Sequence, residues 1–84
     1  MIEIHYFASV REAMQRSKEQ LALPESVTTV ADLVSLLMQQ DESFRSINQS
    51  GNPLLVAVNQ TVVESSYKLS EDDEVAFFPP MTGG

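Results

Sequence analysis

One segment near the middle of the chain has the periodicity of an amphipathic helix, and this feature most constrains the fold. Its apolar side chains recur at spacings of three and four residues, namely Val30, Leu33, Val34, Leu37 and Met38. Thr29 stands three residues before Asp32, which is a signal for the start of a helix. Because 84 residues make one small domain, the strands must share a single core with this helix.

The first part of the chain has the patterns of two short strands. Residues 2–7 alternate between two faces, with Ile2, Ile4 and Tyr6 buried and with Glu3, His5 and Phe7 on the outer face. Leu21 and Leu23 flank Ala22 just before Pro24, which predicts a second strand lying back beside the first.

A short helix is expected between these two strands. Ser9 stands three residues before Glu12, the spacing of a capping box with Ser9 as the N-cap. Val10, Ala13 and Met14 follow at helical spacing. The helix is therefore predicted to begin just after Ser9.

The second half of the chain predicts a hairpin and a last strand. The polar run 48–53 favours a loop, residues 54–58 an apolar core strand, and residues 61–63 a returning strand after a two-residue turn at Asn59 and Gln60. The last strand is expected over residues 74–78, with Val75 and Phe77 facing the core and Ala76 and Phe78 facing outward.

This order of elements predicts the α+β class. One main helix laid across one face of a small mixed sheet buries a single core, and the architecture expected is a β-grasp, the ubiquitin-like roll. We expect the β-grasp domain to span residues 1–78 and an extended flexible tail to span residues 79–84.

Composition excludes several classes of function. The net charge of −7 repels phosphate backbones, so we expect no nucleic-acid partner. The absence of cysteine excludes disulfides, thiolate zinc sites and a side-chain thiol nucleophile. No basic leader segment precedes an apolar run, and no run approaches the ~20 residues that span a bilayer, so we expect a soluble, cytoplasmic protein without a membrane partner.

Few side chains offer catalysis or metal binding. His5 is the one histidine, and no Asp or Ser is spaced to form a relay with it, so a partly solvated strand residue is the better interpretation. The acidic run 71–74 lacks the ligand spacing of a calcium loop, which favours a solvated turn. We expect no metal site and no permanently bound cofactor.

The C-terminal residues have an unusual composition. Two prolines stiffen the base of the tail, and Gly83 and Gly84 leave its tip without side chains. Six extended residues reach about 20 Å, so the tail can deliver the carboxylate of Gly84 into a narrow channel of another protein. The alternative interpretation is an ordinary disordered terminus.

Several short motifs together resemble the small, sulfur-carrying subunits of molybdopterin synthase, which are ubiquitin-like β-grasp proteins. These motifs are Phe7-Ala8, Arg11-Glu12, Asn59-Gln60-Thr61, the run from Asp73 to Pro80, and Thr82-Gly83-Gly84. They span both ends of the chain, and the closing Phe-Phe-Pro-Pro-x-Thr-Gly-Gly is the most specific of them.

The resemblance implies a reaction at the C-terminus. An E1-like enzyme would adenylate Gly84 with ATP, and persulfide sulfur from a donor protein would convert the terminus to a thiocarboxylate. The tail would then enter the large subunit and pass its sulfur to cyclic pyranopterin monophosphate, and two such transfers would build the dithiolene of molybdopterin. Catalytic side chains would lie in the large subunit, within a heterotetramer with two copies of each subunit.

The resemblance and the strand alternation together suggest a docking face. Alternation places Phe7 and Phe78 on the outer side of neighbouring strands, and the family adds Val62 as an apolar contact and Arg11 as a polar rim residue. Along the tail, the partner-binding residues expected are Pro79, Pro80, Met81 and Thr82, with Gly83 allowing the tip to thread. Alternatively, these rings simply cover a small core.

Two positions depart from the family pattern. Met81 stands where a smaller β-branched residue is common, which can alter the fit in the channel. The turn at residues 70–73 lacks the glycine often found there, so Asp72 can strain its backbone.

Other functions remain open on the sequence. A terminal Gly-Gly is also shared by protein modifiers that form isopeptide bonds and by sulfur carriers for thiamine synthesis or tRNA thiolation. A purely structural interaction domain with an incidental tail is a third alternative.

Overall fold

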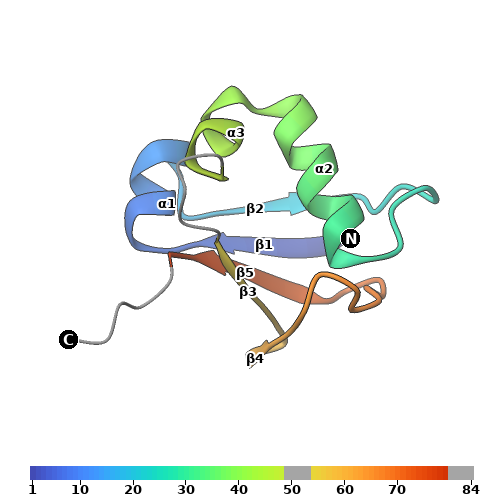
Figure 1. The fold of residues 1–84 in the computed structure, drawn as a ribbon. Coiled ribbons are helices and arrows are strands. Elements are labelled where there is room, and N and C mark those ends of the chain that lie inside the picture. Colours follow the sequence, from blue (N-terminus) through green and yellow to red (C-terminus); the bar gives the residue numbers. More distant parts are fainter. Residues whose placement is uncertain (49–53, 80–84) are drawn as a thin grey trace.

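The computed structural model describes residues 1–48 and 54–79 (Figure 1). Their elements follow the order β1 (Ile2–Tyr6), α1 (Ala8–Met14), β2 (Lys18–Leu21), α2 (Val30–Gln40), α3 (Glu42–Asn48), β3 (Leu55–Val58), β4 (Thr61–Val62) and β5 (Glu74–Phe78). The strands form one sheet in the order β2-β1-β5-β3-β4, in which β1 and β5 run parallel and the other neighbours run antiparallel. This arrangement confirms the expected α+β class and the β-grasp architecture.

The core lies between the sheet and the helices. Along β1 the burial pattern alternates, with Ile2, Ile4 and Tyr6 at 1% exposure or less. Strand β5 alternates in the same way, because Val75 and Phe77 are both fully buried. Both inward sets were predicted from the two-residue period.

Helix α2 begins as the sequence predicts. The hydroxyl of Thr29 accepts a hydrogen bond from the backbone amide of Asp32 at 3.2 Å, and the carboxylate of Asp32 accepts one from the backbone amide of Thr29 at 3.1 Å. Each side chain therefore satisfies a free N–H at the start of the helix. The backbone amides of Thr28 and Thr29 hold the pKa of Asp32 below its ordinary value. The apolar stripe of α2 packs Val30, Leu33 and Leu37 into the core.

Helix α1 begins earlier than predicted. Its N-cap is Phe7, not Ser9, and no side chain caps it. The carbonyl of Phe7 accepts the amides of Val10 and Arg11, so the helix starts directly from the end of β1. The Ser9–Glu12 spacing fits a capping box, but Ser9 already lies within the first turn.

The second strand is also displaced from its predicted place. It spans Lys18–Leu21, whereas the prediction rested on Leu21 and Leu23. Register places Glu19 opposite Ile4 on the inner face, where its carboxylate accepts a hydrogen bond from the Tyr6 hydroxyl at 2.7 Å. Hydrophobic alternation cannot identify an inward acidic residue, because its hydrogen-bond partner is distant in the sequence.

Helix α3 was not predicted. It is only seven residues long, yet it carries Phe44, which is fully buried. Of the predicted loop 48–53, residues 49–53 lie outside the described residues, and Asn48 ends α3.

The hairpin after it is confirmed. Asn59 and Gln60 have φ values of 51° and 71°, as a tight turn between β3 and β4 requires.

Among the described residues, no helix is long and apolar enough to cross a membrane.

Candidate docking face and tail base

Strand register divides the sheet into an inner face beneath the helices and an outer face on the opposite side (Figure 1). A row of register partners on the inner face joins Ile4, Val75 and Val58, all of which belong to the core. The next row lies on the outer face and joins His5, Ala76, Ala57 and Val62.

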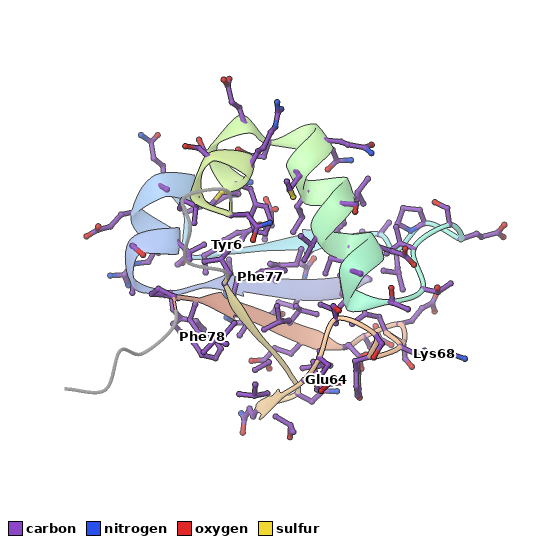
Figure 2. The ribbon with its side chains drawn as sticks, in the orientation of Figure 1. Tyr6, Glu64, Lys68, Phe77 and Phe78 are labelled. Carbon is purple, nitrogen blue, oxygen red and sulfur yellow. The ribbon has the colours of Figure 1, made fainter. Side chains whose placement is uncertain are left out.

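The two phenylalanines predicted for docking are neighbours on the outer face. Tyr6 and Phe77 are register partners on the inner side, so the residues that follow them, Phe7 and Phe78, lie side by side beyond them. Phe7 is 48% exposed, and Phe78 is half-buried against the adjacent strand, where Leu55 is its register partner. Figure 2 shows Phe78 on the side of the sheet away from Tyr6 and Phe77.

Val62 and Arg11, the other two residues predicted for docking, lie on β4 and α1. Val62 on β4 is 61% exposed and pairs with Ala57, which adds an apolar side chain at the edge of the sheet. Arg11 is an exposed residue of α1, and its amide reaches the carbonyl of Phe7 at 3.4 Å. Its guanidinium makes no ion pair with the residues that the structure describes. We name Phe7, Arg11, Leu55, Val62 and Phe78 the docking face.

His5 lies beside this docking face as a structural residue. Its Nε2 is 2.7 Å from a carboxylate oxygen of Glu3 and 3.7 Å from one of Glu74, two residues that are opposite each other on neighbouring strands. Its ring stacks on Phe7 with centroids 6.3 Å apart. The imidazole thus separates two like charges that would repel each other across the strands. This agrees with the partly solvated strand residue expected from the sequence.

The acidic run 71–74 organises a turn. The carboxylate of Asp73 accepts the side-chain amide of Asn59 at 3.0 Å and the backbone amide of Ser70 at 2.8 Å. Asp72 has φ of 69°, so the expected left-handed backbone without glycine is present there. Within residues 1–48 and 54–79, no three His, Asp or Glu side chains are grouped so that they could hold a metal ion.

The base of the tail is anchored through Phe77. This side chain is fully buried, and its ring stacks with Tyr6 and meets Phe44 edge-on, at centroid distances of 6.3 Å and 5.1 Å. Pro79 follows β5 and is half-buried. The remaining predicted tail residues lie outside the described part of the chain, namely Pro80, Met81, Thr82, Gly83 and Gly84.

Sequence reasoning missed part of the docking face. Leu55 and Ala57 share the outer side with Phe78, but the run 54–58 is apolar at every position and so hides its two faces. The signal that would have found them is the register between β3 and β5, which places Leu55 opposite Phe78.

Known proteins resemble this chain over its whole length. Residues 4–84 match the ThiS family. A molybdopterin synthase sulfur carrier subunit of Escherichia coli is 39% identical over 84 residues, covering all of both chains. The SAMP1 structure from Haloferax volcanii has a TM-score of 0.79 at 23% identity, covering 99% of this chain and 98% of that one.

A further solved structure has the same fold within a complex. It is the protein–protein complex of subunits 1 and 2 of the molybdopterin-converting factor from Helicobacter pylori, and the matched chain has a TM-score of 0.67 at 18% identity, with 99% of this chain and 97% of that one covered. The full-length match at 39% identity and the family match together assign the chain. The chain belongs to the ThiS family, within which it groups with the molybdopterin synthase sulfur carrier subunits.

Proposed function

We propose that this chain carries sulfur as a thiocarboxylate on Gly84 and donates it during molybdopterin synthesis. The observation that carries the proposal is the placement of the docking face directly beside the base of the tail, because Phe78 belongs to the first and Pro79 begins the second. A partner that covers the docking face therefore receives the tail at a fixed starting point.

The chemistry follows from the state of the terminal carboxylate. A carboxylate is a poor electrophile because it is anionic and resonance-stabilised, so an E1-like enzyme first converts it to an acyl-adenylate with ATP. Persulfide sulfur then displaces AMP, and reductive cleavage of the resulting acyl disulfide by a thiol leaves the thiocarboxylate. These steps need no cysteine in this chain, and its sequence contains none.

The partner that receives the sulfur is the large subunit of the synthase. The matched Helicobacter pylori structure is a complex of two subunits, which supports a two-subunit assembly here. We place the side chains that bind and convert cyclic pyranopterin monophosphate in that large subunit, and we expect two copies of each subunit in the complex. We expect this ATP-dependent reaction to take place in the cytoplasm.

Docking of the apolar side chains opposes the entropic cost of threading the tail. Ordering four tail residues costs ~4–8 kcal/mol at 1–2 kcal/mol each. Burial of three fully exposed apolar side chains would give ~5–9 kcal/mol. About half of that, ~2–5 kcal/mol, is available here, because Phe7 and Val62 are 48% and 61% exposed in the free domain. The docking face therefore offsets part of the cost of threading.

Reconstitution with the activating enzyme, ATP and a sulfur source tests the proposal. We expect the intact mass of the chain to rise by the difference between one sulfur and one oxygen atom. A chain lacking Gly84 serves as the matched control and should keep its mass. If the full chain never gains this mass, or if the shortened chain gains it too, the proposal is wrong. Stable adducts to lysines of other proteins that depend on Gly84 would instead support a protein modifier.

A further inference from the structure

One side chain, Arg16, bonds three separate elements together. Its Nε donates to a carboxylate oxygen of Glu19 in β2 at 2.6 Å, and one of its terminal nitrogens donates to Asp41, between α2 and α3, at 3.1 Å. The other terminal nitrogen donates to the carbonyl of Met14, the last residue of α1, at 3.2 Å. The planar guanidinium fork can satisfy three such directions, whereas an ammonium group is a point charge.

Two of the three partners of Arg16, Glu19 and Asp41, lead to a ring that contacts Phe77. Glu19 also accepts the hydroxyl of Tyr6 at 2.7 Å, and the ring of Tyr6 stacks on Phe77. Asp41 accepts a hydrogen bond from the amide of Ser43 at 2.9 Å in the first turn of α3, and α3 carries Phe44, which meets Phe77 edge-on. The guanidinium carbon itself lies 5.6 Å from the centre of the Tyr6 ring.

These contacts form a closed circuit around the end of β5. We name it the Arg16 circuit, and its members are Tyr6, Arg16, Glu19, Asp41, Phe44 and Phe77. The pKa values agree with a tight arrangement: hydrogen bonding to Glu19 raises the pKa of Arg16, and burial raises that of Tyr6. Burial acts to raise the pKa of Asp41, but Arg16 and the amides of Ser43 and Phe44 outweigh it and hold that pKa low.

Phe77, the member of the Arg16 circuit on β5, lies two residues before Pro79, where the tail begins. The carbonyl of Phe77 accepts a hydrogen bond from the backbone amide of Phe7 at 3.1 Å, so the strand that leads into the tail is joined directly to the docking face. We propose that Arg16 is a positioning residue for sulfur transfer, because the circuit that it closes fixes the point at which the tail leaves β5 relative to the docking face. This inference rests on the proposed function and adds to it a residue on the helical side of the sheet.

Separate effects of a substitution on kcat and on KM distinguish a role in positioning the tail from a role in docking. Docking uses the outer face, which Arg16 does not touch, whereas the placement of the terminal sulfur depends on where the tail begins. A displacement of about 1 Å far from the reacting atoms can slow an enzyme up to ~100-fold. We therefore expect Arg16→Lys to lower kcat at least about threefold, while KM for the thiocarboxylated chain stays within about twofold.

The experiment uses the complete thiocarboxylated chain with the large subunit and cyclic pyranopterin monophosphate, at a temperature where circular dichroism shows every variant folded. Arg45→Lys is the matched control, since Arg45 is an exposed arginine whose guanidinium, among the described residues, donates to one carbonyl, that of Met38, at 3.1 Å. Tyr6→Phe removes only the hydroxyl link to Glu19, so it should lower kcat in the same direction by less. The double variant Arg16→Lys with Tyr6→Phe should lose less than the product of the two single effects, because both act on one circuit.

The outcomes separate the inference from the proposed function. If the unaltered chain transfers sulfur and Arg16→Lys has the kcat of Arg45→Lys, the positioning role is wrong and the proposed function stands. If the loss in Arg16→Lys lies in KM alone, the circuit acts on docking and the inference is also wrong. If the unaltered chain transfers no sulfur, the proposed function and the inference fail together.

Discussion

At the scale of single residues, the exposed side chains on the outer face of the sheet are the candidates for function, whereas the buried side chains on the inner face form the core. Phe7 stays 48% exposed although Tyr6 beside it in the sequence is 1% exposed, since successive strand residues point to opposite faces. A large ring left in solvent has an energetic cost that burial by a partner removes. Phe7 is therefore a residue whose replacement should change binding more than folding.

The first prediction concerns this ring. Phe7→Ala should weaken binding to the large subunit at least about tenfold, which is the loss typical of a buried aromatic contact. Tyr67→Ala is the matched control, because Tyr67 is 41% exposed but is not part of the docking face. Calorimetric titration measures both affinities, and equal affinities for the two variants would show that Phe7 lies outside the interface.

A second residue-scale prediction concerns the backbone of Asp72. Its φ of 69° costs a residue with a Cβ about 1–2 kcal/mol, whereas glycine adopts it freely but loses more entropy on folding. Asp72→Gly should therefore raise the free energy of unfolding by up to about 1 kcal/mol. Its ion pair with the N-terminus is highly exposed, at 3.6 Å, and contributes little. Urea unfolding measures the change, and a clear destabilisation would contradict this account of the turn.

At the scale of elements, the sequence predicted those elements whose signals are local. The alternation in β1 and β5 and the capping box of α2 depend on residues within a few positions of one another, so their bounds could be predicted closely. Helix α3 and strand β2 depend on partners far along the chain: Phe44 meets Phe77, and Glu19 meets Tyr6. A pattern of hydrophobicity contains neither partner, so α3 was missed and β2 was displaced.

The same reasoning explains the site. Phe7 and Phe78 could be placed from alternation alone, but Leu55 needed the strand register and Arg16 needed three elements to be in place. The described residues end at Pro79, so the threading of the tail remains a prediction from its composition and its family.

The third prediction tests the start of α2. Thr29→Ala removes the hydroxyl that accepts the Asp32 amide and should lower the free energy of unfolding by about 1 kcal/mol. Thr61→Ala is the control, as Thr61 is an exposed residue in a two-residue strand and has no capping role. Chemical denaturation compares the two, and an equal effect would indicate that the capping box adds nothing.

The fourth prediction is the pH dependence of stability. The folded pKa values of Asp32 and Asp41 lie below the ordinary value of about 4, so their stabilisation is complete above that pH and is lost as pH falls through the folded values. Tyr6 has the opposite sign: its raised pKa gives stability below pH ~10 that is lost as pH rises further. Unfolding midpoints from pH 2 to 11 should fall at both ends, and Tyr6→Phe should flatten the alkaline end. An alkaline loss that persists in Tyr6→Phe would contradict the assignment.

At the scale of the whole molecule, a single small core holds the strand from which the C-terminal tail begins. The inner face of the sheet packs against the helices, the outer face lies opposite them, and β5 lies in the middle of the sheet between β1 and β3. Because the last strand is central, the tail begins from a strand that is paired on both sides. This architecture fits the proposed function, in which the C-terminal carboxylate would be presented to an activating enzyme and the thiocarboxylate to a synthase.

The most direct test of this account follows the sulfur itself. The chain is loaded with isotopically labelled sulfur as the thiocarboxylate and mixed with the large subunit and cyclic pyranopterin monophosphate. We predict that the label leaves Gly84, that it appears in the dithiolene of molybdopterin, and that two carriers are consumed for each product formed. Product without label, or labelled carrier that stays loaded while product forms, would contradict the central claim.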